Sequence, residues 1–167
     1  RERRAFEIRE QSLLPGLIDT RQKTEKRLRF WSAGCSTGEE PYSLAILLDK
    51  LIPDLKDWNV TILATDINTG AIRKAEEGIY SDWSFRDNPP WFKEHYFENV
   101  DGNHHRLLPR IRKMVNFSYL NLSEDPYPAL QNNTNAMDFI FCRNVLMYFA
   151  PGQIGLTAER FYRSLLD

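Results

Sequence analysis

Residues 31–48 read WSAGCSTGEEPYSLAILL, and this stretch decides the fold of the chain. The apolar segment Arg27–Ala33 leads into it and predicts a strand. Residues 34–38 then place two glycines four positions apart, which is typical of a turn. From Glu39 to Leu51 the apolar residues recur at helical spacing. The stretch therefore predicts a strand, a glycine-containing turn and a helix in immediate succession.

Strand-like and helix-like segments alternate through the rest of the chain. The clearest is VTILAT at residues 60–65, a β-branched run that ends at Asp66 and is followed by helical spacing up to Gly78. Such alternation predicts an α/β fold, with a doubly wound and mostly parallel sheet covered by helices on both faces. Further strands are expected at 137–142 and, after a hairpin, within 104–119, and helices at 2–18 with a break near Pro15, 69–77, 91–97, 143–149 and 153–166.

The composition indicates a folded domain and excludes several classes of function. The 167 residues carry a formal net charge of −1 and are 42% hydrophobic, 13% aromatic and 27% charged, which suffices for a sizeable core and excludes a disordered chain. A near-neutral charge disfavours nucleic acid and anionic membranes as partners. No apolar run reaches the roughly 18 residues of a membrane span. Because Cys35 and Cys142 lack metal-ligand spacing, we expect no metal site and a reducing cytoplasm.

The turn at residues 34–38 is the expected cofactor site, because ligands of such sheets bind at the carboxyl ends of the strands. A dinucleotide is disfavoured, since GxGxxG is absent and the glutamates Glu39 and Glu40 in the first helical turn would repel a pyrophosphate. GKS and GKT are also missing, which excludes a phosphate-binding loop. A cationic ligand without phosphate fits, and S-adenosylmethionine has that chemistry. The alternative is that both glutamates only stabilise the helix N-terminus.

Two polar residues end predicted strands. Asp66 lies 28 positions after Gly38, where a carboxylate can accept both hydroxyls of a ribose. The spacing equally allows Asp66 to cap the helix that begins near Thr69. Asn121, in YLNLSEDPY, also ends a strand, although a single asparagine at such a place is more often a turn residue. Both residues support a nucleoside ligand without distinguishing one cofactor from another.

The segment FCRNVLMYF at residues 141–149 brings further polar side chains to the same edge of the sheet. On a helix, Asn144 and Tyr148 are four positions apart and share a face, so they and Arg143 are expected to line one pocket. The alternative is an arginine in a surface ion pair and a tyrosine that closes the core. The three histidines form no catalytic or metal-ligand spacing and are expected at the surface.

Taken together, four motifs resemble the chemotaxis receptor methyltransferases of the CheR family: FWSAGCSTGEEPYSLAILL, ILATDIN, NLSEDPY and DFIFCRNVLMYF. The resemblance covers nearly the whole chain, and STGEEPYS and FCRNV are far more specific than a glycine pattern alone. It implies a Rossmann-like class I methyltransferase fold with a small antiparallel insertion. It also implies S-adenosylmethionine as cofactor, S-adenosylhomocysteine as product, and esterification of glutamate side chains in bacterial chemoreceptors.

The resemblance also implies roles for individual residues. Glu40 matches a contact to the methionyl part of the cofactor, and Asp66 a contact to its ribose. Tyr148 matches a tyrosine beside the reacting methyl group, and Arg1 the arginine that ends a T-x-F-F-R-like segment, so these two are predicted to be catalytic. The predicted cofactor-binding residues are Gly34, Ser36, Thr37, Glu40, Asp66, Asn121, Leu122, Arg143 and Asn144.

The family pattern further predicts the surroundings of this domain. Residues 1–167 are expected to form a catalytic domain trimmed at both ends, because a small helical domain normally precedes it and a last hairpin with a GHSE-like element normally follows. A small antiparallel subdomain is expected at about 104–113, where some members dock a receptor's C-terminal tail by strand addition. The expected partner is the cytoplasmic domain of a chemoreceptor, and the protein is expected to be a cytoplasmic monomer.

Two alternative functions remain open at this point. The first is a nicotinamide-dependent oxidoreductase on a similar sheet, which the missing GxGxxG and the paired glutamates disfavour. The second is a non-catalytic module that binds S-adenosylmethionine and acts through partner contacts. The tyrosine and the Arg143-Asn144 pair favour an active enzyme over such a module.

Overall fold

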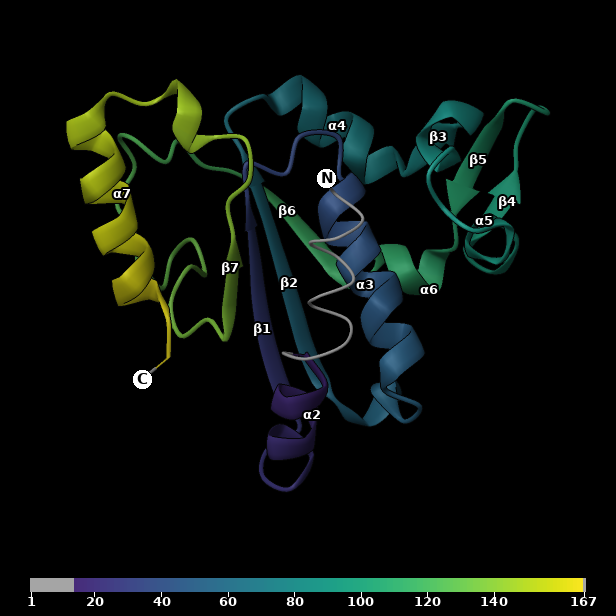
Figure 1. Ribbon diagram of the computed structural model, residues 1–167, viewed down its shortest axis with the longest axis horizontal. Helices are drawn as coiled ribbons and strands as arrows, with labels where there is room; N and C mark the ends of the chain where they lie inside the picture. The colour runs from purple at the N-terminus through teal and green to yellow at the C-terminus, as the bar shows by residue number, and fades with distance from the viewer. Residues whose placement is uncertain (1–13, 167) are drawn as a thin grey trace.

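The computed structural model describes residues 14–166 of the chain. Four strands form a parallel sheet in the order β6-β2-β1-β7, and three short strands form a separate antiparallel sheet in the order β3-β5-β4 (Figure 1). The elements are, in chain order, α2 (Leu14–Gln22), β1 (Arg27–Ala33), α3 (Glu39–Leu51), η2 (Leu55–Asp57), β2 (Asn59–Asp66), α4 (Thr69–Glu77), β3 (Ile79–Ser81), η3 (Asp82–Phe85), α5 (Pro90–Tyr96), β4 (Phe97–Asn99), β5 (His104–Leu107), α6 (Pro109–Arg112), β6 (Val115–Tyr119), β7 (Phe139–Phe141), η4 (Leu146–Tyr148) and α7 (Pro151–Ser164).

The strands β1 and β2 form the centre of the parallel sheet. They pair over seven residues, from Arg27 opposite Asn59 to Ala33 opposite Thr65, and most of their residues are buried. Parallel strands need a crossover connection, and α3 supplies the one from β1 to β2. The parallel sheet predicted from the alternating pattern is confirmed.

Apolar cores cover both faces of this sheet. Leu28 and Phe30 of β1 belong to the core that includes α2 and α3. Trp31 and Ala33, which point the other way because side chains alternate along a strand, belong to a second core. Trp31 packs edge-on against Phe161 of α7 with ring centroids 5.2 Å apart. Figure 1 shows α3 and α7 on opposite sides of the sheet, so the prediction of helices on both faces is confirmed.

The antiparallel sheet lies between α4 and β6 in the chain and to one side of the main sheet (Figure 1). It agrees with the small antiparallel insertion that the resemblance implies. The hairpin expected within residues 104–119 is not formed, because only His104–Leu107 is a strand before Pro109 begins the short helix α6. The strands that flank β5 are β3 and β4, which come earlier in the chain. Each has three residues, too few for alternation to identify them.

The segment after β7 differs most from the sequence prediction. The helix expected over 143–149 is wrong, since only the 3₁₀ turn η4 forms there. Asn144 has a φ of 58°, a left-handed conformation through which a right-handed helix cannot continue. The expected strand at 137–142 shortens to β7, while Met137 makes an isolated parallel bridge to Leu165.

The predicted helices 39–51 and 69–77 have the observed bounds of α3 and α4. The side chain of Asn68 caps α4 by accepting from two backbone N–H groups, so the alternative role of Asp66 as that cap is wrong. Pro15 lies in the first turn of α2, where a missing N–H breaks nothing, and residues 2–13 of the predicted first helix lie outside the described part.

Two further observations concern exposure. His105 is buried rather than at the surface, and its Nε2 lies 2.7 Å from Oδ1 of Asp82. A histidine can be buried at low cost when a ring nitrogen has such a partner.

Between residues 14 and 166, none of the helices combines the length and the apolar character that crossing a bilayer requires.

Candidate functional site

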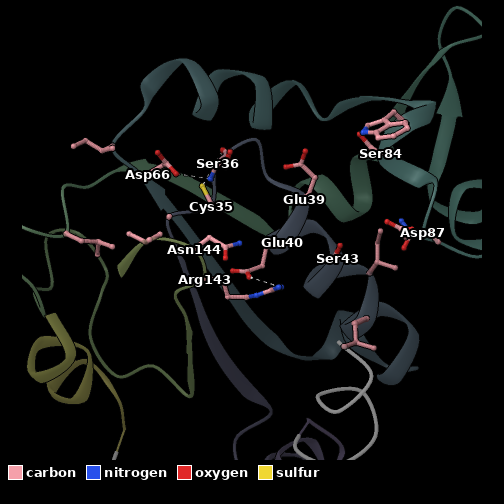
Figure 2. Close-up of a pocket in the computed structure, with 18 of the residues that line it drawn as sticks. Cys35, Ser36, Glu39, Glu40, Ser43, Asp66, Ser84, Asp87, Arg143 and Asn144 are labelled. Carbon is pink, nitrogen blue, oxygen red and sulfur yellow. Dashed lines mark hydrogen bonds and ion pairs between the residues drawn. The ribbon is translucent and has the colours of Figure 1, made fainter. Parts of the chain in front are cut away.

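A cavity of about 1440 Å³ opens at the carboxyl ends of the parallel strands (Figure 2). Its walls include the β1–α3 turn, the end of β2, the segment after β6 and the loop after β7. Of the predicted site residues, those that line it are Gly34, Ser36, Glu40, Asp66, Asn121, Leu122, Arg143, Asn144 and Tyr148. Thr37 does not line it, and Arg1 lies outside the described residues.

The turn after β1 has a backbone that requires glycine. Gly34 has a φ of 82°, and a Cβ placed on it would lie 2.2 Å from Cγ2 of Val145. The N–H groups of Gly34 and Cys35 both donate to the carbonyl oxygen of Thr65, at 2.7 and 2.9 Å. Gly38, with a φ of 91°, then begins α3. The turn is therefore tied to β2 on one side and lies against the 143–149 loop on the other.

Asp66 holds this turn in place from the end of β2. Its Oδ2 accepts a hydrogen bond from the backbone N–H of Ser36 at 2.8 Å, and its Oδ1 accepts one from the backbone N–H of Asn68, also at 2.8 Å. A carboxylate can accept about four hydrogen bonds, so these two contacts leave capacity for a ligand. The side chain faces the cavity while it also stabilises the turn (Figure 2).

Glu40 connects the first turn of α3 to the loop after β7. Its Oε1 accepts from the hydroxyl of Ser32 at 2.8 Å, and its Oε2 lies 3.7 Å from Nη1 of Arg143 (Figure 2). Both side chains of this ion pair are mostly buried. The alternative that Arg143 forms an ion pair is thus correct, but the pair lies in the cavity wall and not at the outer surface.

The neighbouring pair of Thr37 and Glu39 behaves differently. The hydroxyl of Thr37 donates to the carboxylate of Glu39, with its oxygen 2.8 and 2.7 Å from the two carboxylate oxygens. Glu39 also lines the cavity. We define the cofactor end as the part of the cavity lined by Glu39, Glu40, Asp66 and Arg143, which carries three carboxylates and one guanidinium. Formal charges at this end sum to −2, which favours a cationic ligand group.

The remaining predicted residues form the opposite wall and the mouth. Oδ1 of Asn121 accepts from the N–H and the hydroxyl of Ser123, at 3.0 and 2.9 Å, so the asparagine is a turn residue as well as a lining residue. Leu122 is buried and supplies an apolar wall. Tyr148 is 80% exposed at the cavity, and the alternative that it closes the core is wrong.

Sequence reasoning missed several lining residues. Ser43 follows Glu39 by one helical turn, so helical spacing was a usable signal for it. Ile67 follows the strand-ending Asp66 and is exposed. Cys35 also lines the cavity, where burial, followed by the charge of Asp66, raises the pKa of its thiol to about 12. The lining residues between 83 and 92 carry no signal in the sequence.

Comparison with known families agrees with this geometry. The family model described as CheR methyltransferase, SAM binding domain, matches residues 1–167. The chain belongs to the CheR family. Its cofactor is therefore S-adenosylmethionine, and the Rossmann-like methyltransferase fold predicted from the motifs is confirmed by this match together with the parallel sheet. The match favours the methyltransferase interpretation over the nicotinamide-dependent alternative.

Two curated relatives of this CheR domain are named chemotaxis protein methyltransferases. The chemotaxis protein methyltransferase of Borreliella burgdorferi is 35% identical over 163 residues, which is 96% of this chain and 56% of the relative. Chemotaxis protein methyltransferase 2 of Vibrio cholerae is 37% identical over 158 residues, which is 93% of this chain and 54% of the relative. The chain thus spans about half the length of the curated relatives it matches.

The cofactor end of the CheR domain fits S-adenosylmethionine. The ammonium and sulfonium groups of this cofactor are cationic, and the three carboxylates around Glu40 match them. A carboxylate at Asp66 suits vicinal hydroxyls, and Ile67 and Leu122 offer apolar surface for a base.

Proposed function

We propose that this CheR domain is the catalytic domain of a protein-glutamate O-methyltransferase that esterifies glutamate side chains of a bacterial chemoreceptor. The carboxylates of the cofactor end and the exposed Tyr148 line one cavity in a chain of the CheR family, and this observation carries the proposal. The relatives are named chemotaxis protein methyltransferases, which supports methyl transfer in chemotaxis.

In this proposal, different residues of the cavity bind different parts of the cofactor. Glu40 holds the methionyl part, Asp66 the ribose, and Asn121 and Leu122 the base side of the pocket. Gly34 and Ser36 contribute the backbone of the turn that lines the cavity, and Asn144 completes the pocket from the opposite loop. Thr37 acts only indirectly, since its hydroxyl donates to Glu39.

The chemistry requires positioning more than proton transfer. A glutamate with a pKa of about 4.3 is already ionised at neutral pH, so the acceptor needs no general base. When bound, S-adenosylmethionine would supply a sulfonium methyl group, and attack of a carboxylate oxygen on this methyl carbon would release S-adenosylhomocysteine. Alignment of two reactants can lower a barrier by roughly 7–11 kcal/mol. We assign Tyr148 to orient the acceptor carboxylate with one hydrogen bond, and Arg1 remains a predicted catalytic residue.

Methyl transfer to a chemoreceptor, followed by base, tests this function. Labelled methyl should move from S-adenosylmethionine to receptor protein and leave as methanol under base, because a carboxyl ester is base-labile. Label that survives base, or that appears only on nucleic acid or small molecules, contradicts glutamate methylation. Cofactor binding without any transfer would favour the non-catalytic module.

Tyr148→Phe separates the reaction from cofactor binding. We expect the methylation rate of the full-length protein to fall about tenfold or more with little change in cofactor affinity, the pattern of an interaction made mainly in the transition state. Tyr162→Phe on α7 is the matched control, because Tyr162 is 77% exposed and does not line the cavity. Equal effects of the two variants would remove Tyr148 from the reaction centre.

We also propose that the antiparallel sheet docks a receptor's C-terminal tail. Its edge strands are β3 and β4, and an added strand would pair through main-chain hydrogen bonds. Titration with a peptide from a receptor C-terminus tests this, and no binding would restrict recognition to the cavity. The cytoplasmic location and monomeric state remain predictions.

A further inference from the structure

The cavity extends beyond the cofactor end along α3 and residues 83–92. We call this extension the arm and define it by Lys50, Trp83, Arg86 and Trp91, all of which line the same cavity as Glu40. Figure 2 shows Ser84 and Asp87, from this region, across the cavity from Asp66 and Asn144. A ligand that fills the cofactor end therefore leaves a second region of the cavity for another molecule.

Two cations stack on aromatic rings in the arm. Cζ of Arg86 lies 4.4 Å from the ring centroid of Trp83, and Nζ of Lys50 lies 5.1 Å from that of Trp91. Trp83 is 72% exposed, although an indole of this size is normally buried. Exposed aromatic rings beside arginine are typical of surfaces that bind another protein.

Hydrogen bonds and ion pairs support the arm at the η3 turn. Asp82, at the start of η3, accepts from Nζ of Lys93 at 3.0 Å, and Nε2 of His105 lies 2.7 Å from the same oxygen. Lys93 and then His105 hold the pKa of Asp82 below its usual value. Nη1 of Arg86 donates to the carbonyl of Trp83 at 2.9 Å, which fixes the guanidinium over the ring. A platform fixed before binding loses less conformational entropy when a partner binds.

The charge of the arm is opposite to that of the cofactor end. Lys50 and Arg86 are cationic, and Asp87 supplies a carboxylate 3.5 Å from Nε of Arg86. Both partners of that ion pair are exposed, so water screens it strongly. The contacts of Arg86 to Asp87 and to the Trp83 carbonyl use Nε and Nη1, and a guanidinium carries five donors in all. The arm thus suits a ligand with carboxylates beside apolar groups.

We propose that the arm binds the acidic protein segment that flanks the methyl-accepting glutamate. Arg86 pairs with a carboxylate of that segment, and Trp83 packs against its apolar side chains. This inference rests on the proposed function and deepens it, because it assigns acceptor specificity to residues that do not contact the cofactor. The cationic ligand then occupies the anionic end of the cavity and the anionic ligand the cationic arm.

Arg86→Glu in the full-length protein tests the proposal, with a soluble cytoplasmic fragment of a chemoreceptor as methyl acceptor. The KM for the acceptor should rise about tenfold or more, since a charge that paired with carboxylates now repels them. The kcat at saturating acceptor should change by less than about twofold, and the calorimetric affinity for S-adenosylhomocysteine should stay the same. Trp83→Ala should raise the same KM by a smaller factor.

Two variants serve as matched controls. Arg73→Glu reverses an exposed charge on α4, and Tyr162→Ala removes an exposed ring on α7, and neither residue lines the cavity. Both should leave the KM for the acceptor unchanged. An unchanged KM in Arg86→Glu overturns the proposal, and so does a loss of affinity for S-adenosylhomocysteine, which would make the arm part of the cofactor site.

A binding measurement separates failure of this inference from failure of the proposed reaction. Tryptophan fluorescence of the S-adenosylhomocysteine complex should change when the receptor fragment is added, and this change should be lost in Arg86→Glu. If the wild-type protein forms no base-labile ester but shows this change, the proposed reaction fails, and only the binding of an acidic receptor segment by the arm is supported. A change produced by single-stranded DNA and not by the fragment, or an unaltered titration in a correctly folded variant, overturns the arm.

Discussion

The turn at residues 34–38 and the loop at residues 143–149 face the same cavity, yet they hold their shapes for different reasons. The turn has three residues in the left-handed region: Gly34 with a φ of 82°, Ser36 with 49° and Gly38 with 91°. Two of the three are glycines, and the N–H of Ser36 donates to Asp66. The loop places Asn144 in the left-handed region, which costs an ordinary side chain about 1–2 kcal/mol. The two glycines therefore encode most of the turn and Asp66 holds it at Ser36, whereas the loop has no glycine and depends on contacts with its surroundings.

Those contacts come from the turn itself and from α3. Cγ2 of Val145 occupies the space that a Cβ on Gly34 would take, and Glu40 pairs with Arg143. Because Gly34 has no side chain, Val145 of the loop can approach the turn this closely. A substitution at the contact between Gly34 and Val145 should therefore change the stability of both regions, and a substitution away from this contact should affect only the region that carries it.

The largest effect is expected from Gly34→Ala. The new Cβ would lie 2.2 Å from Cγ2 of Val145, in a backbone conformation that alanine rarely adopts. Strain and overpacking together should lower the free energy of unfolding by about 3 kcal/mol, measured by urea denaturation. Cofactor affinity should fall as well, since the turn and the loop both line the site.

Gly152→Ala is the control, because no atom lies within 4 Å of a Cβ at that position. It should cause no loss of stability. The double variant Gly34→Ala, Val145→Ala should recover part of the loss, because it removes the clash but not the backbone strain. Full additivity of the two single changes would show that the regions are not coupled.

Glu40→Gln should have the next largest effect, on cofactor binding. Loss of the charge should weaken S-adenosylhomocysteine by about 1.5–3 kcal/mol in calorimetry, as for hydrogen bonds to charged groups, and adenosine much less. Glu39→Gln is the matched neighbour, and we expect a smaller change because Thr37 already donates to that carboxylate. Equal losses for both ligands in Glu40→Gln would make the residue a structural link only.

The two cysteines report on the two regions by their rates of alkylation. Burial raises the pKa of Cys35, in the turn, to about 12 and that of Cys142, beside the loop, to about 11. Since the thiolate is the reactive form and Cys35 is the more buried of the two, at pH 8 Cys142 should react with iodoacetamide faster than Cys35, and both far more slowly than in urea. Peptide mass spectrometry over time measures the order, and faster labelling of Cys35 would contradict it.

The smallest effect is expected at Asn144. Asn144→Gly should leave the free energy of unfolding nearly unchanged, while Asn144→Ala should lower it by about 1 kcal/mol, because alanine tolerates a φ of 58° less well than asparagine or glycine. Affinity for S-adenosylhomocysteine should fall in both if the side chain contacts the cofactor. Equal stability of the two variants would mean that the loop does not depend on its left-handed residue.

Much of the molecule follows from the sequence alone. The predictions of the strands β1 and β2, the helices α3 and α4 and the turn between Gly34 and Gly38 were correct or nearly so. The cationic preference of the cofactor end stays a prediction. Each of these features depends on local information: side-chain periodicity, glycine at left-handed positions and charge within one helical turn. The family motifs then identified the domain.

The tertiary structure alone decided the rest. It determined that residues 143–149 form a loop and not a helix, that Asp66 holds the turn at Ser36, and that the arm at Trp83 and Arg86 opens on the cofactor cavity. These features arise from contacts between segments far apart in the chain, such as Val145 against Gly34. A periodic pattern carries no record of such contacts, because their energy exists only once the sheet has brought the segments together.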